Sequence, residues 1–227
     1  MDHLDEVART AWTDPGDAGL AVGRNRRYRF EEGFEHGPGF RAPAGHERGT
    51  GADALGTTGD AHGFKVTAFD LSDEAVKSTR GWAERENLDI ETYTGNMLSL
   101  PFQNNSFDCI IAYNVIYHTD MTGFGTILNE IQRILRPGGE MFLTLISKST
   151  WSFTHANKAQ KLDKNTILRN ENEAGEDVPH FYVDIQDIKH FFTNFEFVRL
   201  PVEEHDYDIE NPNKYSVHWK FIVKKKN

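Results

Sequence analysis

Two short runs that read as strands are each followed by side chains of types that can contact a nucleotide. Asp70 ends the first run, and a carboxylate in that position can accept two hydrogen bonds from a ribose diol. Asn96 and Met97 follow the second run; an amide matches the donor and acceptor on an adenine edge, and a thioether packs on a flat ring. The alternatives are structural: Asp70 caps a helix that starts near Ser72, and Gly95-Asn96 is simply a turn.

A third apolar run is followed by groups that can exchange protons. The run ends at Tyr113-Asn114, and Tyr117 and His118 come about one helical turn later. Imidazole and phenol groups act as general bases or acids when they lie near a reacting atom. The alternative is that the Tyr and His side chains are packed in the core with satisfied hydrogen bonds.

Strands and helices alternate along the chain from residue 64. The patterns predict strands at 64–70, 90–94, 107–113, 140–146, 195–201 and 216–224, and helices at 72–86, 124–135 and 184–192. Such alternation indicates right-handed βαβ units and a mainly parallel sheet. Ligands of these sheets bind outside the carboxyl ends of the strands, which is where the candidate residues fall.

Composition bounds the class of protein. The chain has 227 residues, of which 38% are hydrophobic, so one full-sized α/β domain is expected. The formal net charge of −10 argues against nucleic acids and anionic membranes as partners. Cys109 is the one cysteine, which excludes an internal disulfide and fits a reducing compartment. The acidic start and the lack of a long apolar stretch predict a cytoplasmic protein.

The chain divides at about residue 63. Residues 1–63 contain no Lys and no Ile, are rich in Gly, and show no apolar period after a short helix expected at 4–12. Residues 64–227 form the expected core, with a polar insertion at about 148–180. The predicted domains are therefore an atypical N-terminal segment and a core.

Five segments of the core together resemble class I S-adenosylmethionine-dependent methyltransferases. They are 64–72, Gly-Asn-Met at 95–97, Leu-Pro-Phe at 100–102, 107–114 and Leu-Arg-Pro-Gly-Gly at 135–139. The ending His218-Trp-Lys-Phe-Ile-Val more loosely resembles small-molecule members akin to tellurite-resistance methyltransferases. The resemblance implies a Rossmann-like, doubly wound, seven-stranded sheet with helices on both faces, and S-adenosylmethionine as cofactor.

The resemblance also assigns cofactor contacts. It implies that Asp70 holds the ribose hydroxyls and that Leu71 lies beside the adenine. Asn96 and Met97 would bind the edge and face of that ring, and Asn114 would lie near the methionine part of the cofactor. Residues 135–139 are expected to be a structural helix stop.

The family's glycine-rich loop is degenerate here. The candidate is Gly45–Leu55, in which Gly49 and Gly51 fit the end of the pattern, but Glu47 stands where its first Gly belongs. Either the loop is divergent, or residues 1–63 are not the family's N-terminal sequence. One hypothesis is a change of reading frame, since codons for Gly37–Arg41, read one base later, can encode Asp-Leu-Gly-Ser-Gly.

Methyl transfer from a sulfonium depends mainly on alignment, so no nucleophilic triad is expected. If the acceptor must lose a proton, His118 is the first candidate base, with Tyr117 or His180 second. His155 and His205 are expected at the surface. Four aromatic residues either line an acceptor pocket or anchor the insertion: Trp151, Phe153, Phe181 and Tyr182.

The rival functions are a nicotinamide-dependent oxidoreductase and a catalytically inactive methyltransferase-like protein. The first also uses an acid at a strand end, but the chain lacks its Gly-x-Gly-x-x-Gly turn. The compact chain favours a small-molecule acceptor, and scattered carboxylates predict no required metal. The sequence leaves the oligomeric state and the acceptor open.

Overall fold

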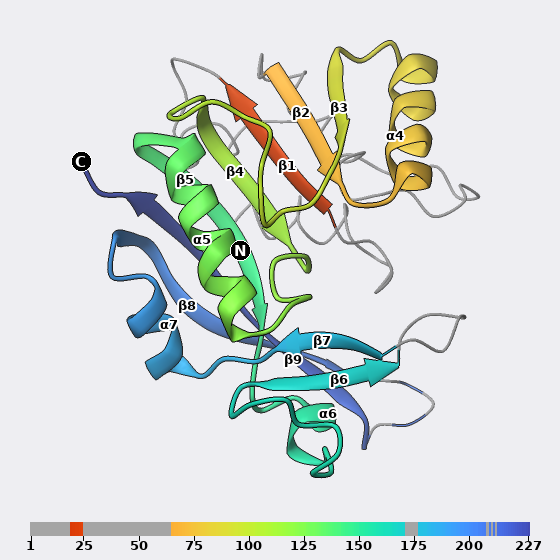
Figure 1. Cartoon of the computed structure of the whole chain (residues 1–227), viewed down its shortest axis with the longest axis vertical. Helices are drawn as coiled ribbons and strands as arrows, with labels where there is room; N and C mark the ends of the chain where they lie inside the picture. Colours follow the sequence, from red (N-terminus) through yellow and green to blue (C-terminus); the bar gives the residue numbers. More distant parts are fainter. Residues whose placement is uncertain (1–18, 25–64, 171–176, 208, 210, 212) are drawn as a thin grey trace.

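The computed structural model describes residues 19–24, 65–170, 177–207, 209, 211 and 213–227. Seven strands form one sheet in the order β3-β2-β1-β4-β5-β9-β8 (Figure 1). The strands are β1 Gly19–Arg24, β2 Lys65–Asp70, β3 Ile90–Thr94, β4 Phe107–Tyr113, β5 Leu135–Ile146, β8 Phe195–Tyr207 and β9 Tyr215–Lys225. The sheet is twisted, and β3 and β8 form its two edges.

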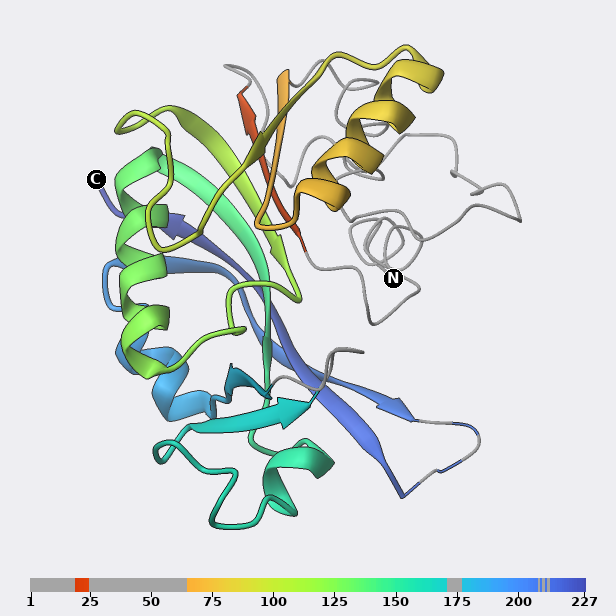
Figure 2. The same cartoon turned by 45° about the vertical axis from the view of Figure 1, so that its right-hand side comes forward.

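The helices begin where the sequence supplies caps. They are α4 Asp73–Glu86, α5 Met121–Ile134, α6 Trp151–Thr154 and α7 Ile185–Phe191. Ser72 is the N-cap of α4, as predicted, and its hydroxyl accepts a hydrogen bond from the Ala75 N–H at 3.2 Å. Asp184 caps α7 in a capping box. Figure 2 shows α4 and α5 on opposite sides of the sheet.

The prediction of a mainly parallel, seven-stranded sheet is confirmed in part, because five of the seven described strands run in one direction. Only β2 with β3 and β4 with β5 pair in parallel. β1 lies antiparallel between β2 and β4, and β9 runs antiparallel to both β5 and β8. The fold is a mixed α/β sheet in which two strands, the central β1 and the C-terminal β9, run opposite to the other five.

The core lies mainly between α5 and the sheet. Phe124, Ile127 and Ile131 of α5 are buried in one cluster with Ile110 of β4 and Leu143 of β5. A smaller cluster lies on the other face, where Ile111, Phe142 and Ile222 meet. Because neighbouring residues of β4 enter both clusters, this strand is apolar throughout, as its sequence predicts.

β5 begins five residues earlier than predicted. It includes the Pro-Gly-Gly segment that was expected only to stop the preceding helix. The pairing of β4 with β5 shifts in register between Phe107 and Cys109, which accommodates this irregular start. Gly139 is buried there, and a Cβ on it would lie 2.9 Å from the Arg136 carbonyl oxygen. The close backbone approach explains why glycine occupies this position.

The polar insertion folds into a small unit. It contains α6 and an antiparallel pair, β6 Thr166–Asn170 and β7 Asp177–Phe181. Ile167 and Phe181 are fully buried in the main core, and Phe153 packs against it. The aromatic residues of the insertion therefore serve as its anchors.

Two features of the N-terminal segment can be compared with the sequence analysis. The expected helix at 4–12 lies outside the described residues. The segment after residue 14 shows no apolar period in its sequence, yet β1 occupies Gly19–Arg24. Its sequence, GLAVGR, is too short and too rich in small residues to show an apolar period.

Candidate functional site at the carboxyl ends of three strands

Asp70 lies where the ends of β2 and β3 meet. Its backbone carbonyl accepts a hydrogen bond from the Gly95 N–H at 2.9 Å, so the turn after β3 is fixed to the end of β2. The carboxylate is half-buried, and its Oδ1 accepts the Ser72 N–H at 2.8 Å. Ser72 provides the helix cap itself, and Asp70 orders the connection that leads into it.

Burial raises the pKa of Asp70, and hydrogen bonds from the backbone N–H groups of Ser72 and Leu71 oppose that effect. A carboxylate has about four acceptor sites, so the bond to Ser72 leaves capacity for a hydroxyl pair. Leu71 beside it is 72% exposed, which is unusual for a large apolar side chain next to a half-buried acid. The pair offers a polar and an apolar contact to one ligand.

Asn96 and Met97 form the turn that follows β3. The Asn96 side-chain oxygen accepts the Leu98 N–H at 2.9 Å, the geometry of an Asx turn. Asn96 is exposed, whereas Met97 packs against the main core. The turn interpretation therefore holds for Asn96, whose residue is exposed and follows the strand paired with the Asp70 strand.

Asn114 fixes the end of β4. Its φ is +48°, in the left-handed region that asparagine tolerates better than most residues. Its N–H donates to the Thr144 hydroxyl at 2.8 Å, and that hydroxyl donates back to the Asn114 side-chain oxygen at 2.8 Å. The contact joins β4 to β5 and turns the chain toward Tyr117.

Tyr117 and His118 lie in a cluster of four rings drawn from three segments, the loop after β4, β7 and β9. Tyr117 is 5% exposed, and its ring centroid lies 4.6 Å from that of His118, 6.1 Å from that of His180 and 6.0 Å from that of His218. The His118 and His180 rings meet edge to face at 4.7 Å. The structure therefore brings together all three residues predicted to act on protons.

The tautomers of two of these histidines follow from their partners. His118 Nδ1 lies 3.1 Å from the Val115 carbonyl oxygen, and His180 Nδ1 lies 3.0 Å from that of Val178. A carbonyl oxygen only accepts, so in each neutral ring Nδ1 carries the proton and Nε2 is the basic atom. His118 is half-buried and His180 is buried, which makes His118 the more accessible base.

The two groups of candidate residues share one edge of the sheet. β1 lies between them, pairing Leu20 with Phe69 of β2 and with Ala112 of β4. Phe69, Leu20 and Ala112 thus lie side by side across β2, β1 and β4. Asp70 and Asn114 come just after Phe69 and Ala112, so they lie at the same end of the sheet. Gly49 and Gly51 lie outside the described residues.

Sequence reasoning missed one member of the ring cluster. His218 lies on β9, and its Nε2 is 3.4 Å from the Tyr117 hydroxyl. The alternation of residues 216–224 marked the strand but gave no reason to bring this histidine to the end of β4. His155 and His205 are exposed, as predicted.

The aromatic residues of the insertion act as anchors rather than as an open pocket. Tyr182 is fully buried, its hydroxyl lies 2.8 Å from the Ser152 hydroxyl, and its ring lies 4.9 Å from that of Phe153. Phe181 is also fully buried, while Trp151 is half-buried and stacks on His155.

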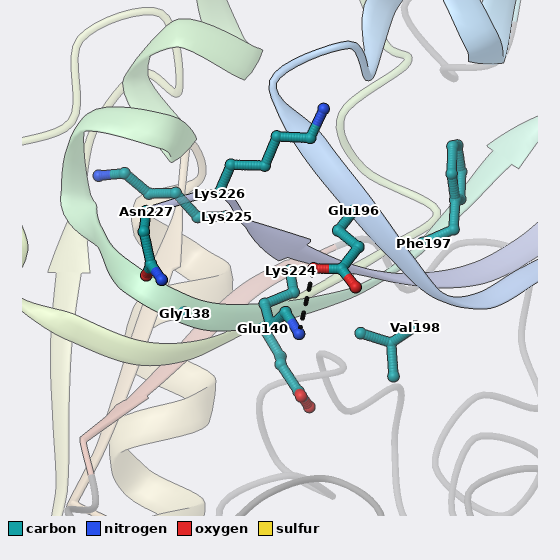
Figure 3. A pocket seen from close by; sticks show the side chains of 9 residues that line it. All are labelled: Gly138, Glu140, Glu196, Phe197, Val198, Lys224, Lys225, Lys226 and Asn227. Carbon is teal, nitrogen blue, oxygen red and sulfur yellow. Dashed lines mark ion pairs between the residues drawn. The ribbon is translucent and has the colours of Figure 1, made fainter.

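A pocket of about 490 Å³ lies at the opposite end of the sheet (Figure 3). It lies where β5 begins and β9 ends, and Lys224 and Glu196 form an ion pair of 3.2 Å across it. Lys225 donates to the Leu135 carbonyl and Lys226 to that of Thr193. These cations hold strand ends together, far along the strands from the candidate site.

The described residues contain neither a group of metal ligands nor a membrane-spanning helix. Among them, no three or more His, Cys, Asp or Glu side chains are grouped as metal ligands would be. No helix of the described chain is long and apolar enough to cross a membrane.

Residues 48–139 match the family model of a methyltransferase domain. The matched segment contains every predicted cofactor and catalytic residue: Gly49, Gly51, Asp70, Leu71, Asn96, Met97, Asn114, Tyr117 and His118. A demethylmenaquinone methyltransferase of Geobacillus sp. is 26% identical over 102 residues, which are 44% of this chain and 40% of that protein.

Solved methyltransferases share the fold. An S-adenosylmethionine-dependent methyltransferase of Methanosarcina mazei superimposes with a TM-score of 0.57 at 19% identity, covering 70% of this chain and 81% of that one. A 1,6-didemethyltoxoflavin-N1-methyltransferase of Burkholderia thailandensis, solved with S-adenosylhomocysteine and 1,6-didemethyltoxoflavin, gives 0.50 at 16% identity, covering 78% and 69%. The chain is therefore similar to a methyltransferase domain in sequence over residues 48–139, and its fold is similar to that of S-adenosylmethionine-dependent methyltransferases.

The edge of this methyltransferase-like sheet fits the cofactor where the structure describes it. S-adenosylmethionine carries a ribose diol, an adenine and a sulfonium. The half-buried Asp70 carboxylate has capacity for the diol, and exposed Leu71 and Asn96 offer apolar and polar contacts beside it. Asn114 and the ring cluster lie farther along the same edge.

Proposed function

We propose that the chain binds S-adenosylmethionine at the ends of β2, β3 and β4 and transfers its methyl group to a small-molecule acceptor. The observation that carries the proposal is the half-buried Asp70 carboxylate, whose residue is held to the turn after β3 through its backbone carbonyl and lies inside the segment that matches the methyltransferase family. Gly49 and Gly51 lie in the same segment, and we include them in the proposed cofactor site.

Each residue has a distinct part in this proposal. Asp70 accepts the two ribose hydroxyls, and Leu71 covers one side of the adenine. Asn96 and Met97 contact the edge and face of that ring. Asn114 fixes the end of β4 beside the methionine part of the cofactor. These residues orient the cofactor and exclude water from it.

The bound cofactor supplies a methyl group already activated on a sulfonium, so the protein's main task is alignment. An acceptor that carries a proton also needs a base. His118 serves best, because its Nε2 is basic and its ring is half-buried beside Tyr117. Tyr117 is the second proton-exchanging group of the proposed site.

A small molecule is the proposed partner. The net charge of −10 disfavours nucleic acid and anionic membrane surfaces. The methyltransferases of similar sequence and fold named above act on a demethylmenaquinone and on 1,6-didemethyltoxoflavin, as their names state. The single cysteine suits a reducing cytoplasm.

The proposal is tested with S-adenosylmethionine labelled in the methyl group and a panel of small metabolites. We expect label in at least one acceptor, and loss of that label in Asp70→Asn and His118→Gln. The matched control His155→Gln changes an exposed histidine outside the site and should behave as the unchanged protein. Cofactor binding without any transfer would favour the inactive methyltransferase-like protein, and binding of a nicotinamide cofactor instead would favour the oxidoreductase.

A further inference from the structure

Tyr117 is connected to the protein surface through two residues of the C-terminal hairpin. The Tyr117 hydroxyl lies 3.4 Å from His218 Nε2, and His218 Nδ1 lies 3.8 Å from Asp206 Oδ2. Exposure rises along the series: Tyr117 is 5% exposed, the His218 side chain 16% and the Asp206 side chain 72%. The three groups lead from a buried phenol to a solvated carboxylate.

Backbone pairing holds Tyr117, His218 and Asp206 in place without relying on the contacts between their side chains. In the pairing of β8 with β9, His218 stands opposite Glu204, so Asp206 is its diagonal neighbour two residues along. On its other side, His218 pairs with Ile146, the last residue of β5. The Tyr117 carbonyl accepts the Phe181 N–H at 2.8 Å, which holds the loop after β4 against β7. Figure 2 shows β8 and β9 continuing past this end of the sheet.

We propose that Tyr117, His218 and Asp206 form a proton relay that carries the acceptor's proton from the ring cluster to solvent. This inference rests on the proposed function. It narrows the acceptor to a group that loses a proton when it is methylated, such as a hydroxyl, a thiol or an amine with an N–H. Thioethers and tertiary amines have no such proton and would not need the relay.

The protons and charges balance in this scheme. The bond between the sulfonium sulfur and the methyl carbon breaks, and its electron pair stays on sulfur as a neutral thioether. A lone pair of the acceptor forms the new bond to the methyl carbon. The acceptor's proton passes to the Tyr117 oxygen, so in this scheme Tyr117 replaces the neighbouring His118 as the immediate base. Tyr117 gives its own proton to His218 Nε2. The positive charge thus moves from sulfonium to imidazolium, next to the Asp206 carboxylate, and is then lost as a proton to water.

The charged neighbours support this direction of transfer. His218 faces Tyr117, with His118 and His180 beyond it, and Glu204 and Asp206 on β8. Lys220 forms an ion pair of 2.6 Å with Glu204. That pair offsets the charge of Glu204, so Asp206 is the carboxylate that interacts with His218.

Asp206 is suited to remain ionised. The interaction with His218, whose Nδ1 lies 3.8 Å away, is the main cause that holds the pKa of Asp206 below its ordinary value, against the opposing effect of partial burial. Burial, together with the nearby Glu204 and Asp206 carboxylates, raises the pKa of Tyr113 to about 12. His218 and Asp206 act through Tyr117 and are positioning residues.

The relay requires a particular tautomer of His218, which ¹⁵N NMR of the imidazole measures without any substrate. We expect the neutral ring to carry its proton on Nδ1, toward Asp206, with Nε2 accepting from Tyr117. In Asp206→Ala the population should shift toward the Nε2–H tautomer, and His155 should give an unchanged signal in both proteins. A neutral His218 with its proton on Nε2, or a tautomer unaffected by Asp206→Ala, would overturn the relay whether or not methyl transfer occurs.

Activity provides the second arm, with catechol, benzenethiol and methylamine as proton-bearing probes and dimethyl sulfide and trimethylamine as probes without that proton. His218→Gln should lower the rate of transfer to the first group about 100-fold, the size of a general-base contribution, with unchanged affinity for S-adenosylhomocysteine. The remaining rate should rise with pH as hydroxide replaces the relay. An equal loss at every pH would indicate a merely structural role. If the unchanged protein does not bind S-adenosylhomocysteine, that result would instead contradict the proposed function.

Discussion

Asn114 combines a left-handed backbone with a side chain bonded to the neighbouring strand, and the two features can be separated by substitution. Asn114→Ala removes the hydrogen bond between the Asn114 side-chain oxygen and the Thr144 hydroxyl. It also places at φ +48° a residue that has a Cβ but no side-chain hydrogen bond. Asn114→Gly removes only the bond. We expect the alanine variant to lose about 2 kcal/mol of unfolding free energy and the glycine variant about 1 kcal/mol less than that, by urea denaturation.

The order of the two variants decides the interpretation of Asn114. Equal stability of the glycine and alanine variants would show that the left-handed conformation costs nothing at this position. Thr144→Val is the matched partner change, because it removes the same hydroxyl contact from β5. In the double variant with Asn114→Gly, the loss of unfolding free energy should be smaller than the sum of the two single losses.

Single residues differed in how far their surroundings could be predicted. Asp70 and Asn114 were found because each ends an apolar run, and strand ends are set by local sequence. His218 could not be found in this way, because its neighbour Tyr117 lies 101 residues away along the chain. Contacts of this kind depend on strand order and register, and periodicity contains neither. The roles of the site residues stay predictions.

Two glycines on neighbouring elements should respond to alanine in opposite directions. In Gly139→Ala at the start of β5, the new methyl group meets the Arg136 carbonyl oxygen at 2.9 Å and the Asp108 carbonyl oxygen at 3.0 Å. A Cβ on Gly125 in α5 would meet nothing within 4 Å. We expect Gly139→Ala to lose about 1–3 kcal/mol and Gly125→Ala to gain up to about 1 kcal/mol of unfolding free energy. Thermal unfolding of the two variants measures both changes; a stable Gly139→Ala would contradict the close backbone approach.

The cap of α7 should make stability depend on pH. Partial burial tends to raise the pKa of Asp184, but hydrogen bonds from Lys148 and from the backbone of Asp187 and Gln186 outweigh it and hold the pKa below the ordinary value. A depressed pKa contributes stability that is present above about pH 4 and is lost as the pH falls through the folded value.

Asp184→Asn isolates the charge, because asparagine caps helices about as well as aspartate. The variant should be less stable at pH 7 by less than about 1 kcal/mol, since the Asp184 side chain is 47% exposed. The difference should shrink below pH 4 when urea midpoints are compared. A difference that does not change with pH would show that the ion pair with Lys148 contributes nothing.

Most elements were predictable because their signals are local. Ser72 as a helix cap and the apolar period of α5 placed those elements to within a few residues. The start of β5 was not predictable, because Pro-Gly-Gly is typical of a turn and only its pairing with β4 makes it a strand. The small residues of β1 gave no signal, since backbone hydrogen bonds to two neighbours hold it in the sheet.

At the scale of the whole molecule, strand direction separates the prediction from the structure. The order β3-β2-β1-β4-β5 brings Asp70 and Asn114 to one edge, and that consequence holds. The central strand nevertheless runs antiparallel, so it begins rather than ends at the candidate cofactor site.

The reading-frame hypothesis belongs to the same scale and stays a prediction. It requires that the alternative frame upstream of residue 63 encode a continuous strand and glycine-rich loop of the methyltransferase type. The nucleotide sequence of the gene measures this directly. An alternative frame broken by stop codons would remove the hypothesis and leave Gly49 and Gly51 as the divergent loop.

Binding of S-adenosylhomocysteine, followed by calorimetry, tests the proposed cofactor site most directly. We expect one molecule to bind per chain, and Asp70→Asn to weaken binding about 10- to 100-fold, the equivalent of losing 1.5–3 kcal/mol from hydrogen bonds to a charged group. Asp89→Asn, which changes an exposed aspartate away from the strand ends, should bind as the unchanged protein does. Absence of binding, or equal affinity in all three proteins, would contradict a cofactor site at Asp70.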